Sequence, residues 1–170
     1  EGVKVLFVDT EMDNSDTQAV TQRIHRLNGW ETDTNAPQLV ALNLREQSQP
    51  ERMAIVEEAI KEIQPDLVLL DGIVDLCASF NEIQPSQEAV TKLTQLATTY
   101  DCHVVTCLHV NKGTQELRGH LGAFLRQKGE LTLLLAKKDE ETPYIECKPI
   151  DSRHRSIDEF CFRINNDALP

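Results

Sequence analysis

Apolar residues up to about residue 110 come in short runs separated by stretches of helical periodicity. Each run is apolar throughout rather than at every second position, which is typical of strands that are buried on both faces. The predicted strands cover residues 3–8, 39–44, 67–71 and 103–109. Because helical stretches lie between these strands, the pattern predicts a mostly parallel sheet with helices on both faces.

Cap and turn residues locate the three helices of this region. The first helix begins in the cluster Asp13-Asn14-Ser15, whose side chains are good N-caps, and ends before Asn28-Gly29. The second opens at Pro50 and ends before Pro65. Its apolar face is formed by Met53, Val56, Ala59, Ile60 and Ile63. The third helix is predicted over residues 86–100, after a loop at 79–85.

The pattern changes after residue 110. A loop is predicted from Val110 to about Gly122, followed by strands at 131–136, 144–147 and 160–164 with short charged or Pro-containing turns. Such short connections favour antiparallel pairing, so the sheet is expected to finish antiparallel. We find no internal repeat, low-complexity stretch or second-domain signal, and residues 1–170 are predicted to form one α/β domain.

The composition narrows the class of protein. Apolar residues make up 40% and charged residues 26% of the chain, an ordinary balance for a globular domain. No run reaches the roughly 20 apolar residues of a membrane span, and no secretory leader is recognised. Five cysteines without a C-x-x-C pair favour packing roles in a reducing cytoplasm over zinc or disulfides. The net charge of −11 argues against a free-standing nucleic-acid binder.

Three polar residues lie at or just beyond the carboxyl ends of three of the predicted strands: Glu11, Asp71 and His109. Ligands of an open parallel sheet bind beyond the carboxyl ends of its strands, where these side chains should meet. A carboxylate in this position can hold Mg²⁺, and a second can orient or deprotonate an attacking water. A histidine on a neighbouring strand can detect a γ-phosphate. Each residue alone also fits a cap or a solvated turn, but together they favour nucleoside-triphosphate hydrolysis.

Six segments extend the pattern around these residues: VLFVDTE at 5–11, LVLLDG at 67–72, HVNK at 109–112, LRG at 117–119, DSR at 151–153 and FCFRI at 160–164. In their order and spacing these segments resemble the motifs of RecA-like P-loop ATPases, in particular the replicative-helicase branch that includes DnaB and RepA. The resemblance covers nearly the whole chain. It implies a RecA-like three-layer α/β/α fold with a mostly parallel central sheet and an antiparallel C-terminal edge.

The same resemblance implies roles for individual residues. Glu11 would be the catalytic base, Asp71 the Mg²⁺ carboxylate and His109 the γ-phosphate sensor, so that Asp71 and His109 bind ATP and Mg²⁺. Arg153 would reach the nucleotide of an adjacent subunit in a ring or filament, with a surface ion pair as the alternative. Lys112 and Arg118 would contact single-stranded DNA or RNA, with a solvated loop as the alternative.

Two features depart from the family pattern. No G-x-x-x-x-G-K-[ST] motif occurs in the 170 residues, and without it the affinity for ATP should be poor. In the family this loop lies upstream of the strand at 3–8, so we expect an N-terminally truncated core whose intact form hydrolyses ATP and which is itself inactive. The second departure is Asp151, where the branch often has a lysine two residues before the arginine finger.

These observations leave two principal functions open. The chain could be the C-terminal part of an ATPase core from a helicase, plasmid-replication or mobile-element protein, or a non-enzymatic assembly module derived from the same fold. Either form should self-associate through a sheet edge left open by the missing strand. A receiver-type signalling domain fits less well, because Asp9 and Asp71, which would be its acidic pair, lie too far apart in the sequence. A Rossmann-type enzyme is also disfavoured, because no G-x-G-x-x-G motif follows any predicted strand.

Overall fold

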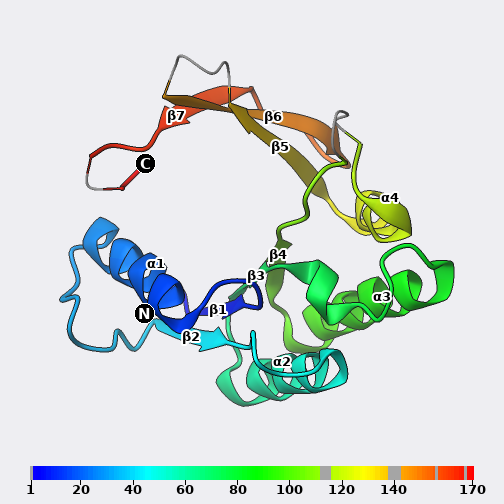
Figure 1. Ribbon diagram of the computed structural model, residues 1–170, viewed down its shortest axis with the longest axis horizontal. Coiled ribbons are helices and arrows are strands. Elements are labelled where there is room, and N and C mark those ends of the chain that lie inside the picture. Colours follow the sequence, from blue (N-terminus) through cyan, green and yellow to red (C-terminus); the bar gives the residue numbers. More distant parts are fainter. Residues whose placement is uncertain (1, 112–115, 138–142, 156, 167) are drawn as a thin grey trace. The chain divides into compact units, whose positions relative to one another are not determined.

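Four parallel strands form the sheet of the N-terminal part of the chain, in the order β2-β1-β3-β4 (Figure 1). The computed structural model describes residues 2–111, 116–137, 143–155, 157–166 and 168–170. The strands are β1 (Val5–Asp9), β2 (Leu39–Asn43), β3 (Leu67–Asp71) and β4 (His103–Thr106). Their helices are α1 (Asn14–Leu27), α2 (Gln49–Ile63) and α3 (Ile83–Tyr100), with a 3₁₀ turn η1 at Ile73–Leu76.

The strand order fixes which helix covers which face of the sheet. The chain moves from β1 to β2 in one direction and then returns past β1 to β3 and β4. Because such crossovers are right-handed, this reversal puts α1 on one face and α2 and α3 on the other, as Figure 1 shows. The arrangement confirms the predicted α/β/α layering around a mostly parallel sheet.

The centre of the sheet is buried on both of its faces. Successive residues of β1 point to opposite faces, yet Leu6, Phe7 and Val8 are all buried. From α2, Val56 and Ile60 contribute fully buried side chains, in agreement with the apolar face predicted for this helix. At the edge of the sheet, β4 pairs only with β3 among the described residues, and its Val105 is 42% exposed.

The remaining strands form a sheet of their own. The strands β5 (Leu131–Lys137), β6 (Tyr144–Ser152) and β7 (Phe160–Arg163) pair antiparallel in sequence order. The chain divides into two compact units, residues 1–124 and 125–170. The expectation that all 170 residues belong to one ATPase core stays a prediction. No helix among the described residues is long and apolar enough to span a membrane.

Most predicted elements agree with the structure to within a few residues. The first helix begins after Asp13, whose side chain caps the amides of Ser15 and Asp16. Helix α3 begins at Ile83, three residues before its predicted start, because Pro85 fits within a first helical turn. The principal difference is α4 (Gly119–Lys128), which occupies part of a predicted loop. Its glycines Gly119 and Gly122 are poor helix formers and obscured it.

Candidate active site

The carboxyl ends of β1 and β3 lie level at the point where the strand order reverses. The two strands pair in register, with Asp9 opposite Asp71. The helix after β1 covers one face of the sheet and the helix after β3 covers the other, so the two following loops diverge and leave a crevice between them. Glu11 follows β1 and Asp71 ends β3, so the fold places both predicted carboxylates at this crevice.

The turn after β1 holds Glu11 by its backbone. Asp9 is fully buried, and its Oδ1 accepts hydrogen bonds from the backbone amides of Glu11 and Met12, both at 3.0 Å. Its Oδ2 accepts from Thr17 Oγ1 at 2.5 Å. One carboxylate therefore joins the end of β1, the Glu11 turn and the first turn of α1.

A second set of hydrogen bonds joins this turn to the end of β3. The Thr10 amide donates to the Asp71 carbonyl at 2.9 Å. The Thr10 hydroxyl lies within hydrogen-bonding distance of the carbonyls of Asp71 and Gly72, both at 3.1 Å, and of Asp75 Oδ2 at 3.0 Å. The Glu11 side chain lies directly over Gly72, where an added Cβ would stand 2.6 Å from Glu11 Oε1. A side chain at position 72 would therefore collide with the predicted base.

A small hollow of about 80 Å³ brings the three predicted residues together. It is lined by Glu11, Asp71, Val74, Cys107, Leu108 and His109. His109 Nε2 lies 3.6 Å from Glu11 Oε2, and the two side chains are 75% and 40% exposed. Glu11 is thus accessible to water, and a protonated His109 would form an ion pair with it.

The negative charges of this cluster affect one another. Partial burial, together with the charges of Glu11 and Asp9, raises the pKa of Asp71, while His109 and a hydrogen bond from the Cys107 thiol oppose the shift. Loss of solvent around the sulfur and the charge of Asp71 raise the pKa of Cys107, although the residue as a whole is exposed. The site therefore carries more negative charge than its own groups compensate, which favours a cationic ligand.

The donor set at the crevice fits Mg²⁺ bound together with a phosphate. Glu11 and Asp71 offer carboxylate oxygens, which Mg²⁺ prefers. No group of three His, Cys, Asp or Glu side chains in the described part of the chain could hold a metal ion by itself. In proteins Mg²⁺ is usually bound by one or two carboxylates, with water and substrate phosphates completing the shell.

The other predicted site residues lie elsewhere. The Arg118 guanidinium lies 4.4 Å from the centre of the Phe80 ring, a cation–π contact between the loops that follow β3 and β4. Arg153 donates from its side chain to the Gln127 carbonyl and from its backbone to the Glu130 carbonyl. Lys112 is outside the described residues. None of the three predicted roles is tested by these contacts.

Asp151 has a partner within its own unit, the guanidinium of Arg126. The carboxylate of Asp151, which departs from the family pattern, therefore neutralises the charge of Arg126, and the contact connects β6 with α4. The same contact raises the pKa of Arg126.

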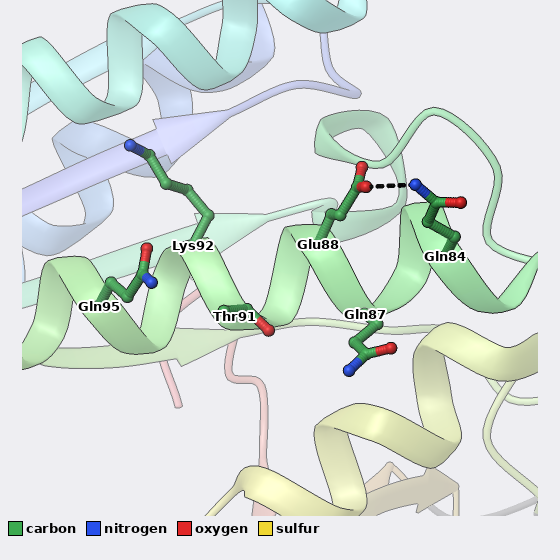
Figure 2. Close-up of a pocket in the computed structure, with 6 residues that line it drawn as sticks. All are labelled: Gln84, Gln87, Glu88, Thr91, Lys92 and Gln95. Atoms are coloured by element: carbon green, nitrogen blue, oxygen red, sulfur yellow. Dashed lines mark hydrogen bonds between the residues drawn. The ribbon is translucent and has the colours of Figure 1, made fainter.

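A larger but shallow hollow of about 460 Å³ lies on α3 and contains none of the predicted site residues. Figure 2 shows its polar side chains, which are Gln84, Gln87, Glu88, Thr91, Lys92 and Gln95. Gln84 donates to Glu88 at 2.8 Å, and Lys92 forms an ion pair with Glu57 of α2 at 2.6 Å. The two charged groups of this surface, Glu88 and Lys92, therefore already have partners, and the other residues that line it are neutral amides and a hydroxyl.

Three residues of the site were not predicted as functional: Asp9, Thr10 and Cys107. Asp9 and Thr10 belong to the VLFVDTE segment. The partners of Thr10 lie as far as 65 residues away in the chain, so no local signal identifies it, whereas those of Asp9 lie within eight residues and form only when the turn after β1 leads into α1. Cys107 lies within the predicted strand at 103–109, in which it was expected to pack. In the structure β4 ends at Thr106, and Cys107 lines the hollow instead.

Comparison with known proteins gives the family and the fold of the chain. A family model described as an AAA domain matches residues 1–115. A solved structure, that of the KaiC-like protein PH0186 from the hyperthermophilic archaeon Pyrococcus horikoshii OT3, superposes with a TM-score of 0.68 at 12% sequence identity. The match covers 98% of this chain and 74% of that chain, and it supports a shared fold. A search of curated proteins found no match.

Proposed function

The chain belongs to the AAA domain family, and from this premise we propose that it is a RecA-like P-loop ATPase whose crevice is the hydrolytic part of an ATPase site. The observation that carries the proposal is the meeting of Glu11, Asp71 and His109 around one hollow at the switch point of the sheet. The substrate would be ATP with Mg²⁺, as is general for such ATPases.

Each of the three residues has a role that its surroundings support. Glu11, partly exposed and anchored through its backbone, would orient and deprotonate the attacking water. Asp71 would hold Mg²⁺, which neutralises charge on the phosphate that is transferred. His109, 3.6 Å from Glu11, would contact the γ-phosphate and change its interaction with Glu11 according to whether that phosphate is present.

The backbone that cradles the phosphates is a separate requirement. The 170 residues contain no G-x-x-x-x-G-K-[ST] sequence. We therefore propose that polypeptide outside them supplies this cradle in the working enzyme and that the 170 residues alone do not hydrolyse ATP. The same observation favours a second candidate, a non-enzymatic assembly module built on this fold.

The finer parts of the proposal concern partners. We propose that the working enzyme is a helicase, plasmid-replication or mobile-element protein that assembles into a ring or filament. Arg153 would act on the nucleotide of the next subunit, and Lys112 and Arg118 would contact single-stranded DNA. The charge of Arg118 would serve contacts with phosphates, and the Phe80 ring, whose centre lies 4.4 Å from the guanidinium, would hold the side chain in place. The acidic net charge requires these contacts to be local.

The decisive test is hydrolysis of Mg·ATP by the full-length protein and by its Glu11→Gln variant. Removal of a general base should lower kcat by about 10²–10⁴-fold. Glu62→Gln, an exposed carboxylate near the C-terminal end of α2, is the matched control and should keep the wild-type rate. Calorimetry of Mg·ATP binding separates the two candidates, because a full-length protein that neither binds nor hydrolyses ATP would be an assembly module.

A further inference from the structure

The carboxylate of Asp9 is completely buried at the end of β1. Burying such a group is costly unless its oxygens are hydrogen-bonded. Asp9 accepts three hydrogen bonds, and all three donors are neutral: the amides of Glu11 and Met12, and the hydroxyl of Thr17. We therefore ask which parts of the structure the three hydrogen bonds of the Asp9 carboxylate hold in place.

Two of the three bonds hold the Glu11 turn itself. Oδ1 accepts from the Glu11 and Met12 amides, so a single oxygen sets the direction in which the chain leaves β1. On its other side the turn is fixed by Thr10, which bonds to the end of β3. The Glu11 backbone is therefore fixed from two directions, and its side chain extends over Gly72 toward the hollow.

The third bond joins this turn to two further elements. Thr17, in the first turn of α1, donates to Asp9 Oδ2 and lies 2.6 Å from Asn43 Nδ2, which donates to its hydroxyl. The same Asn43 nitrogen donates to the Met12 carbonyl at 2.9 Å. Asp9 thus lies at the centre of a hydrogen-bond network that connects the C-terminal ends of β1 and β2 with the first turn of α1.

We propose that Asp9 is a positioning residue for Glu11, acting on the hydrolytic step through the turn rather than by contact with substrate. The inference rests on the proposed function, in which Glu11 activates the water. A carboxylate suits this position better than an amide, because both of its oxygens can accept and Thr17 and the two amides all donate. Its charge also acts on Asp71, whose pKa it helps to raise, so Asp9 is coupled to the predicted Mg²⁺ carboxylate as well as to the Glu11 turn.

The test is a double-mutant cycle on ATP hydrolysis by the full-length protein. Asp9→Ala removes the anchor of both amides, and a displacement of the base by about 1 Å should lower kcat on the order of 10²-fold. The KM for Mg·ATP should stay within about twofold, because ground-state binding is unaffected. In the Glu11→Gln background, Asp9→Ala should have almost no further effect on kcat, since residues that act as a unit are not additive.

Conservative variants provide the controls. Asp9→Asn keeps one oxygen for the two amides and should recover most of the rate lost in Asp9→Ala. If Asp9→Ala does not fold, Thr17→Val tests the same link: it frees the second oxygen and should lower kcat by about three- to tenfold, the worth of one hydrogen bond. Thr17→Ser keeps the hydroxyl and should behave as the wild type.

The outcomes separate this inference from the proposed function. If Glu11→Gln hydrolyses ATP at the wild-type rate, the proposed function fails. If Glu11→Gln is inactive but Asp9→Ala keeps its kcat, the positioning role alone is overturned. An Asp9→Ala effect of the same size in both backgrounds would also overturn it, because a general loss of structure does not depend on Glu11.

Discussion

Replacing Gly72 by alanine puts a methyl group where the Glu11 side chain now lies. Gly72 has φ +96°, and the added Cβ would stand 2.6 Å from Glu11 Oε1, 2.8 Å from Glu11 Cγ and 2.8 Å from Thr10 Oγ1. Glu11 can swing away, since it ends in a flexible, partly exposed carboxylate. Thr10 cannot, because it is buried and its hydroxyl lies within hydrogen-bonding distance of three oxygens.

The expected cost follows from these two contacts. A non-glycine residue at positive φ costs about 1–2 kcal/mol, and disturbing a buried hydrogen bond of Thr10 adds about 0.5–1.5 kcal/mol. Gly29→Ala is the matched control, because Gly29 also has positive φ, +68°, but an added Cβ there has nothing within 4 Å. We therefore expect Gly72→Ala to lower the free energy of unfolding by about 0.5–1.5 kcal/mol more than Gly29→Ala does.

Urea unfolding of both variants, followed by circular dichroism, measures this difference directly. The m-values should match the wild type, so that the shift in midpoint reports stability alone. Equal losses in the two variants would refute the reasoning, because the steric contact with Thr10 would then have no energetic effect. Hydrolysis by the full-length Gly72→Ala protein gives a second readout, and a kcat lower by about tenfold or more is expected if Glu11 is displaced.

Three further perturbations give independent tests. Asp71→Asn should stabilise the fold at neutral pH, because partial burial and the charges of Glu11 and Asp9 raise the pKa of Asp71 in the folded state. The contribution of Asp71 to stability is present in acid and lost as pH rises, so the gain should vanish below the ordinary Asp pKa of about 3.9 in urea titrations. Ile60→Ala, at a fully buried position of α2, should lower the free energy of unfolding by about 2–5 kcal/mol. The control Ile83→Ala, at a position 59% exposed, should lower it by less than about 0.5 kcal/mol. Similar losses in the two variants would show that Ile60 is not part of the core. Val105→Lys on β4, which pairs only with β3 among the described residues, should weaken self-association about tenfold in analytical ultracentrifugation. A chain that is monomeric at all concentrations would contradict the expected use of this edge.

The sequence was a good guide wherever a single segment carried the signal. The apolar run at 67–71 predicted β3 with its closing Asp71, and the capping cluster at 13–15 predicted the start of α1, because both depend on neighbouring residues. The role of Thr10 depends on partners in β3 and η1, 61 to 65 residues away, which only folding brings close. The partners of Asp9 are near in the chain, but their contacts depend on the geometry of the turn after β1. Helix α4 was missed for a different reason. Gly122 lowers the helix propensity of this segment, and a hydrogen bond from the Leu121 amide to the Phe80 carbonyl, which lies outside the segment, offsets that loss.

The position of β1 in the middle of its sheet has a consequence for how the protein is made. Its second neighbour, β3, lies far along the chain: the Lys4 amide just before β1 bonds to Asp66, 62 residues later. At a synthesis rate of about 5–20 residues per second, the strand that leads to Glu11 leaves the ribosome several seconds before β3 can pair with it. During that interval an apolar strand has an unpaired side, and the nascent chain should depend on chaperones most strongly at this stage.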